Sequence, residues 1–179
     1  MRIVAGKYRH RLIEYPDDAL HIRPTKDRIR EALFSSLGDI SHLRVLDLYA
    51  GSGAMGLEAL SRDAKECVFV DNNKVAIKTI KNNIANLGIE NYLLLFKDDK
   101  EALEELKNKG YKFNLVILDP PYKSEAYIEV IHYLIDNALL NENARIVTEC
   151  NRPLDFSGVH TKNIKEHRYG EIIVNVLYL

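Results

Sequence analysis

The sequence predicts an α/β fold in which helices cover both faces of a mainly parallel sheet. Short, continuously apolar runs alternate with longer segments of helical periodicity, and this alternation is typical of consecutive βαβ units. The apolar runs do not alternate between polar and apolar residues, which indicates strands that are buried on both faces. Buried strands are expected at residues 44–49, 67–70, 92–96, 115–118 and 145–148.

The segments between these strands carry the spacing of amphipathic helices. The second of them is the clearest, because Ile77, Ile80 and Ile84 form one apolar stripe. Gly88 follows at the position where many helices end in the left-handed conformation. Helices are expected at about residues 54–63, 74–87, 99–109 and 125–138.

Both ends of the chain depart from this rhythm. Residues 2–15 are expected to form a β-hairpin that turns near Gly6, and a helix with Thr25 as its N-cap should follow. At the other end, the strand-like runs 159–167 and 171–178 are expected to pair as an antiparallel hairpin around Tyr169 and Gly170.

The length of 179 residues predicts one domain, with an N-terminal appendage at residues 1–40 and a catalytic core at 41–179. Cys67 and Cys150 lie in apolar runs without Cys or His at metal-ligand spacing, so we expect buried thiols and no metal. Unpaired thiols indicate a reducing, cytoplasmic setting. No apolar stretch approaches the ~20 residues of a membrane span, so no membrane partner is expected.

The formal net charge of −1 does not decide whether nucleic acid is a partner, but cations gather before the main domain. The first eleven residues contain no acid. A basic edge on a nearly neutral protein is either a footprint for phosphates or a solvated charged face, and charge alone leaves both open. The candidate phosphate contacts are Arg2, Lys7, Arg9, Arg11, Arg23 and Arg28.

A glycine-rich segment, residues 47–56, joins the first predicted strand to the helix that follows it. Gly51 and Gly53 lack Cβ, which lets the backbone turn sharply and approach a ligand closely. Asp71 ends the next strand about 20 residues later, where a carboxylate can accept hydrogen bonds from ribose hydroxyls. A tight turn without a ligand is the alternative, but the combination favours a cofactor that contains adenosine.

Asp47, at the start of this segment, distinguishes between two adenosine cofactors. A nicotinamide dinucleotide carries a pyrophosphate that binds a helix N-terminus directly. S-adenosylmethionine carries a sulfonium and an amino acid instead. Because an acid suits a cationic ligand better than a pyrophosphate, Asp47 favours S-adenosylmethionine.

A second motif, Asp119, Pro120, Pro121 and Tyr122, follows the fourth predicted strand. It lies at the carboxyl edge of the sheet, where α/β proteins bind ligands. The prolines fix the backbone and remove two donors, so a carboxylate and a carbonyl can both accept from an exocyclic amine. We expect Asp119 and the Pro120 carbonyl to orient such an amine and Tyr122 to stack on its base. A plain Pro-Pro turn is the alternative.

Four further residues near these motifs are candidates for the cofactor site. Asp98 follows the third strand and either accepts from the adenine amine or caps the next helix. Tyr49 is expected to pack rather than to form a platform for a base. It is placed with Ser52 and Asn72 among the residues beside the cofactor.

Together these residues resemble the RsmD family, bacterial methyltransferases of guanine N2 in small-subunit (16S) ribosomal RNA. The resemblance implies a class I S-adenosylmethionine-dependent methyltransferase, Rossmann-like, with a seven-stranded sheet whose last strand is antiparallel. It implies 16S rRNA, or an assembly intermediate of the small ribosomal subunit, as the partner. It runs nearly from end to end of the chain: residues 2–6, 23–25, 27–28, 30–31, 33–34, 47–53, Asp71, 119–122 and 169–170.

Two other functions stay open. A DNA or other RNA amino-methyltransferase, acting on adenine N6 or cytosine N4, would share residues 119–122. A DNA enzyme normally needs extra sequence to read bases in the major groove, and this chain has no such insert. A non-catalytic RNA-binding module would keep the basic N-terminus, but it has no reason to keep both the cofactor acids and residues 119–122.

Overall fold

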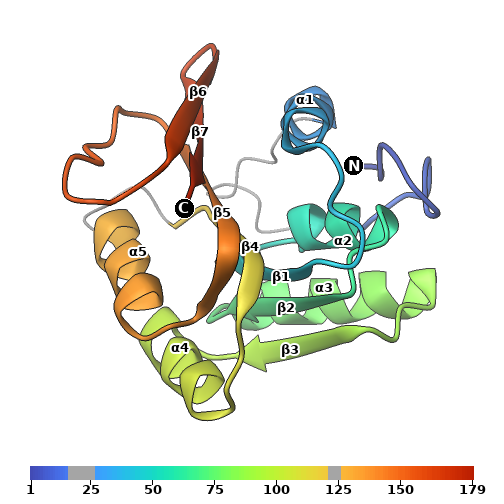
Figure 1. Cartoon of the computed structure of the whole chain (residues 1–179). Coiled ribbons are helices and arrows are strands. Elements are labelled where there is room, and N and C mark those ends of the chain that lie inside the picture. Colours follow the sequence, from blue (N-terminus) through green and yellow to red (C-terminus); the bar gives the residue numbers. More distant parts are fainter. Residues whose placement is uncertain (16–26, 121–125) are drawn as a thin grey trace.

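The computed structural model describes residues 1–15, 27–120 and 126–179. Within these ranges, seven strands form one sheet in the order β3-β2-β1-β4-β5-β7-β6 (Figure 1). The strands are β1 (Arg44–Leu48), β2 (Glu66–Asp71), β3 (Tyr92–Phe96), β4 (Phe113–Leu118), β5 (Leu140–Cys150), β6 (Asn163–Tyr169) and β7 (Ile172–Tyr178).

The strands β1 to β5 run parallel, and β7 runs antiparallel to both of its neighbours, β5 and β6. The predicted parallel sheet with an antiparallel last strand is therefore confirmed. Two boundaries differ from the prediction by four residues or more. β5 begins at Leu140 rather than at 145, because Leu140 already pairs with Phe113 of β4. The sixth strand begins at Asn163 rather than at 159, because Val159 closes a turn by donating to the Phe156 carbonyl at 2.9 Å.

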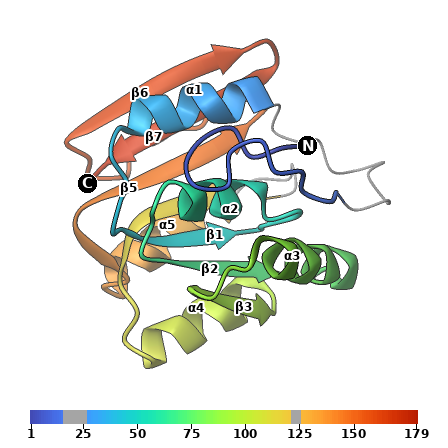
Figure 2. The same ribbon diagram turned by 90° about the vertical axis from the view of Figure 1, so that its right-hand side faces the viewer.

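In the described part of the chain, five helices cover this sheet (Figures 1 and 2). α1, α2 and α3 pack on one face, and α4 and α5 pack on the other, each over its own apolar core. In β1, Val45 faces the first core while Leu46 and Leu48 face the second, so the strand is buried on both faces. The helices are α1 (Asp27–Leu37), α2 (Ala54–Ser61), α3 (Lys74–Leu87), α4 (Asp99–Asn108) and α5 (Ala126–Asp136).

The strand order reverses direction between β1 and β4. From β1 the chain proceeds outward to β2 and β3, and it then returns to the other side of β1 for β4 and β5. The loops after β1 and β4 diverge at such a point, which opens a crevice at the carboxyl edge of the sheet. The topology thus brings residues 47–56 and residues 119–120 to the same edge.

Residues 1–15 fold back on themselves, but their hairpin contains a single antiparallel bridge, between Arg2 and Leu12. The predicted turn is present, with Gly6 at a φ of +79°. A Cβ on Gly6 would lie 1.8 Å from the Ser61 carbonyl oxygen, so only glycine lets the turn approach α2 this closely.

Side chains of α2 replace the strand pairs that the hairpin lacks. The Glu58 carboxylate accepts the backbone N–H of Val4 at 2.9 Å and that of Ala5 at 3.1 Å. The Ser61 hydroxyl accepts the N–H of Tyr8 at 3.0 Å. Backbone groups that are satisfied from another element do not pair across the hairpin, so α2 sets its conformation.

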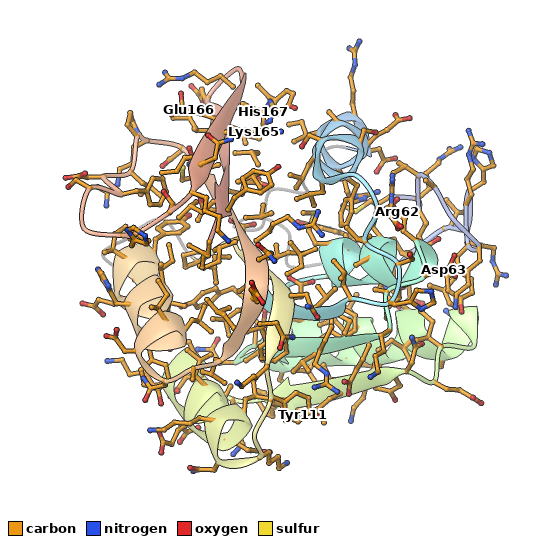
Figure 3. All side chains as sticks on the ribbon, viewed as in Figure 1. Arg62, Asp63, Tyr111, Lys165, Glu166 and His167 are labelled. Carbon is orange, nitrogen blue, oxygen red and sulfur yellow. The ribbon has the colours of Figure 1, made fainter. Side chains whose placement is uncertain are left out.

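A buried ion pair beneath the hairpin joins α1 to α2. The side chains of Arg30 and Glu58 are both 0% exposed, and Nε of Arg30 lies 3.5 Å from Oε2 of Glu58. Asp27 extends the network at 2.9 Å from Arg30, and Arg62, labelled in Figure 3, extends it at 2.8 Å from Glu58. Arg30 also donates to the Arg2 carbonyl, so one network ties α1, α2 and the hairpin together.

Three smaller expectations can be compared with the structure. Cys67 and Cys150 are free and buried, as predicted. Within the residues that are described, no helix has the length and apolar character needed to cross a membrane. The expected N-cap Thr25 lies outside the described residues, and α1 is described from Asp27 onward.

Candidate active site

A cavity of about 330 Å³ opens at the carboxyl edge of the sheet, where β1, β2 and β4 end. Small-molecule sites typically measure about 300–1,000 Å³. Among the described lining residues, Lys97 has the one basic side chain, and no group of His, Cys, Asp or Glu side chains in the described ranges is arranged to hold a metal ion. Six carboxylates from the described parts of the chain line the cavity: Asp47, Asp71, Asp98, Asp99, Asp119 and Glu149.

The loop after β1 turns sharply against β2. Gly51 and Gly53 have φ values of +55° and +77°, and Gly53 is the N-cap of α2. Gly51 lines the cavity, whereas Gly53 shapes the turn behind it. A Cβ on Gly56 would lie 2.3 Å from the Phe69 ring and 2.6 Å from the Cys67 sulfur, so this glycine allows α2 to pack directly on β2.

Asp47 lies within β1 and is 3% exposed. Its Oδ2 accepts the backbone N–H of Gly56 at 2.8 Å. Burial raises the pKa of Asp47 to about 7; the Gly56 hydrogen bond opposes this shift and the charge of Asp71 adds to it. A cation bound beside Asp47 would favour its ionised form and lower this pKa.

Asp71 ends β2 and holds two loops at the cavity. Its Oδ2 accepts the N–H of Gly51 at 2.8 Å, and its Oδ1 accepts the N–H of Asn73 at 2.8 Å. An ionised carboxylate has about four acceptor positions, so Asp71 can still accept from ligand hydroxyls. Ser52 and Asn72, which the sequence places beside the cofactor, also line the cavity.

Tyr49 and the start of α4 form another part of the wall. Of the two roles predicted for Asp98, the cap is present, because its Oδ1 accepts the N–H of Glu101 at 2.8 Å, and Asp98 also lines the cavity. The Tyr49 hydroxyl donates to Oδ2 of Asp99 at 2.6 Å. Burial, and then this bond, raise the pKa of Tyr49 well above its ordinary value. Tyr49 is therefore a packed, hydrogen-bonded part of the wall.

Asp119 and Pro120 line the cavity at the end of β4. Burial raises the pKa of the Asp119 carboxyl well above its ordinary value, and the charges of Glu149 and Asp47 raise it further. Neighbouring carboxylates in a site of low polarity do not all ionise together. Pro121 and Tyr122, the rest of this motif, lie outside the described residues.

This surplus of carboxylates suits a ligand with net positive charge. S-adenosylmethionine carries a sulfonium and an ammonium group against one carboxylate. The N-cap of α2 is Gly53, which has no side chain to cap the helix, and the first residue of the helix, Ala54, lines the cavity. Asp47 accepts the N–H of Gly56 on this first turn, and a helix N-terminus favours a ligand carboxylate. A pyrophosphate would instead face six acids. The residues present therefore fit S-adenosylmethionine better than a dinucleotide.

The sequence does not single out several residues that line the cavity. Glu149 lies near the end of β5. Like Asp119, it is an acid at the carboxyl end of a parallel strand, and this position is a sequence signal that could have identified it. Asp99 is adjacent to the predicted Asp98 but becomes part of the site only through its bond to Tyr49. Met1 also lines the cavity, and nothing in the local sequence indicates it.

The hairpin tip does not reach the cavity. The Lys7 backbone N–H donates to the Ser61 carbonyl at 2.8 Å, at the end of α2 that is farther from the cavity. Since a helix rises about 1.5 Å per residue, the eight residues of α2 place the tip about 12 Å along this axis. Arg23 lies outside the described residues. The other predicted phosphate contacts have exposed side chains: Arg2, Lys7, Arg9, Arg11 and Arg28.

Comparison with known proteins places the chain in a family. The family model described as Conserved hypothetical protein 95 matches residues 1–178. Ribosomal RNA small subunit methyltransferase D of Escherichia coli K12 is 37% identical over 150 residues, which cover 83% of this chain and 74% of that protein.

Solved structures with a similar fold include the Escherichia coli protein yhhF. It has a TM-score of 0.86 and 32% identity to this chain, and the match covers 99% of this chain and 97% of that one. SMU.776, solved in complex with SAH, shares the class I methyltransferase fold at 15% identity and a TM-score of 0.69, over 89% of this chain and 50% of that one. The chain therefore belongs to the RsmD family, the family of ribosomal RNA small subunit methyltransferase D.

Proposed function

We propose that this chain is a ribosomal RNA methyltransferase that uses S-adenosylmethionine to methylate the exocyclic N2 amine of a guanine in 16S rRNA. The observation that carries the proposal is the meeting of two groups of residues in one cavity: Asp47 and Asp71 on either side of the glycine-rich loop, and Asp119 with Pro120. Membership of the RsmD family supports ribosomal RNA as the substrate. The choice of guanine N2 rests on the family resemblance.

S-adenosylmethionine is the cofactor, and it supplies a methyl group bonded to a positively charged sulfur. In this proposal Asp71 accepts hydrogen bonds from the ribose hydroxyls, and Asp98 accepts one from the adenine amine. The charge of Asp47 offsets the positive groups of the cofactor. The surrounding wall consists of Tyr49, Gly51, Ser52 and Asn72.

The target amine is held at the end of β4. The two N–H groups of this amine donate hydrogen bonds to the Asp119 carboxylate and to the Pro120 carbonyl. In this orientation the nitrogen lone pair faces the methyl group. Such positioning supplies as much as about 7–11 kcal/mol of a barrier in favourable cases. The raised pKa of Asp119 also suits this carboxylate to receive the proton that the amine nitrogen loses. Stacking of the base on Tyr122 completes the proposal.

Mass mapping of methyl groups on small-subunit RNA, from cells with and without the gene, tests this function. One N2-methylguanine should be missing from the RNA of cells that lack the gene. It should return when the wild-type gene is restored, but not when the restored gene carries Asp119→Ala. A lost methyl group on adenine N6, on cytosine N4 or on DNA would overturn the choice of base. An unchanged methylation pattern would overturn the function as a whole.

A further inference from the structure

The outward face of α3 carries a row of cations that belongs to none of the motifs above. Lys74, Lys78 and Lys81 are exposed and stand four and three residues apart, which places them on one side of the helix. α3 contains no acidic residue. Among the ion pairs of the described residues, none involves any of these three lysines.

On α4 and β6, by contrast, acids lie beside the cations. On α4, Lys107 and Lys109 each pair with a glutamate one helical turn away, at 3.8 and 2.5 Å. On the edge strand β6, Lys165 and Glu166 alternate in sign (Figure 3), and Arg168 pairs with Glu166 at 2.7 Å. The row on α3, without acids beside it, therefore differs from the charged surfaces of α4 and β6.

α3 connects the cavity to the N-terminal hairpin. Asn72 and Asn73, which directly precede Lys74, line the cavity. Near the other end of the helix, the Arg11 guanidinium donates to the Asn86 carbonyl at 2.9 Å. The 14 residues of α3 span about 20 Å, and Figure 1 shows the helix lying between the sheet and the side of the molecule where the hairpin folds. Along the helix, the lysine row lies between the cavity-lining Asn73 and the contact of Arg11 with Asn86.

The hairpin and α3 form one fixed surface. Asn83 accepts the N–H of Glu14 at 2.7 Å and donates to the Glu14 carbonyl at 3.1 Å. Asn82 donates to the Glu14 carboxylate at 3.0 Å. Residues 1–15 and α3 together hold seven lysines and arginines and one acid, Glu14, in a chain whose net charge is −1.

We propose that Lys74, Lys78 and Lys81 form, with the hairpin cations, a continuous track that binds the phosphates of an unpaired RNA strand and leads it to the cavity. This inference rests on the proposed function. The hairpin tip lies too far from the cavity to hold the phosphates next to the target base, and the α3 lysines fill that interval. Neighbouring lysines of the row are separated by about 6 and 4.5 Å along the helix axis, so each can contact a different phosphate. Such contacts fix the register of a strand without reading its sequence.

The test measures how salt weakens binding of a labelled single-stranded RNA of about 20 nucleotides, between about 50 and 200 mM KCl. Replacing Lys74, Lys78 and Lys81 by Gln should reduce the slope of log K against log salt by about 2, because each lost phosphate contact removes about 0.7. Replacing the same residues by Arg should keep the slope. A triple Gln variant at Lys107, Lys109 and Lys112 removes equal charge on the opposite face and should leave the slope unchanged.

An unchanged slope in the α3 Gln variant would show that the row merely solvates a surface. An equal fall in the α4 control would show an effect of net charge, which also overturns the track. If the triple variant melts early, Lys78→Gln alone should still lower the slope by about 0.7. The proposed function can fail independently of the track. If the α3 Gln variant has the reduced slope but the wild-type protein methylates no small-subunit RNA, the function is refuted and the track is not.

Discussion

The Asp47 carboxyl is 3% exposed within β1, where burial and the charge of Asp71 raise its pKa to about 7. Its folded pKa therefore lies above the ordinary value of 3.8. For such a group the contribution to stability is full below about pH 4 and is lost as the pH rises through 7. Above pH 7 the ionised Asp47 therefore destabilises the protein without ligand. At the same pH its negative charge attracts a cationic ligand most strongly.

Asp47→Asn should accordingly stabilise the empty protein at alkaline pH. The difference between the two pKa values corresponds to at most about 4 kcal/mol. At pH 8 the variant should melt several degrees above the wild type, since 1 kcal/mol shifts Tm by about 2–4 °C at this size. At pH 4 the two should melt together. Thermal melts at both pH values measure this, and equal differences at the two would contradict the assignment.

Asp119 is expected to act on the target base rather than on the cofactor, because it lies at the end of β4 beside Pro120. Asp119→Ala should slow methyl transfer by at least about tenfold to a hundredfold while S-adenosylmethionine still binds. Asp119→Asn should keep partial activity, because its amide oxygen still accepts a hydrogen bond without charge. Single-turnover methylation of small-subunit particles measures each rate, and calorimetry measures cofactor binding. Loss of cofactor binding in both variants would contradict this role.

At the scale of elements, α2 is the centre of the molecule's N-terminal half. Glu58 on one turn of α2 holds the hairpin backbone, Arg30 of α1 and Arg62 at its own end. Met1 and Tyr15, at the two ends of the hairpin, line the cavity. The position of that wall therefore depends on a buried carboxylate that has no contact with the ligand site.

Removing the charge of the buried Glu58 should lower the free energy of unfolding far more than removing the charge of a glutamate in an ion pair near the surface. Breaking a buried ion pair typically costs about 3–5 kcal/mol, and the charge of Arg30 would then be paired with Asp27, whose side chain is 40% exposed, instead of with the fully buried Glu58. Glu66 pairs with Arg44 at 2.8 Å near the surface, and such pairs contribute about 0–1 kcal/mol. Urea unfolding of Glu58→Gln and Glu66→Gln measures both losses. Similar losses in the two variants would mean that the buried network does not hold the hairpin.

The elements that the sequence predicts well are those whose signal is local. The stripe of Ile77, Ile80 and Ile84 and the following Gly88 define α3 from Lys74 to Leu87, the predicted bounds. The hairpin is less predictable, because its backbone is satisfied by Glu58, more than fifty residues away. Glu149 lies near the carboxyl end of β5, which is a local signal, but only the pairing of β5 with β4 brings it to the same cavity as Asp119.

At the scale of the whole molecule, a net charge of −1 conceals two opposite fields. Six carboxylates face the cavity, while seven cations and one acid occupy residues 1–15 and α3. A cleft lined by one sign of charge concentrates ligands of the other sign. The acidic cavity thus attracts the cationic cofactor, and the basic surface beside it attracts an RNA backbone. The two substrates therefore bind to surfaces of opposite charge.

Binding of S-adenosylmethionine should therefore depend on pH through Asp47. If the cofactor binds the ionised form and the empty site has a pKa of about 7, then Kd should rise about eightfold between pH 7.5 and pH 6. The amino group of the cofactor stays largely protonated over this range, since such groups titrate near about 7.7–8.0. Asp47→Asn should bind more weakly and lose most of this dependence. Calorimetric titration of both proteins at the two pH values measures it, and a wild-type Kd that is equal at both would mean that Asp47 does not face the positive charge.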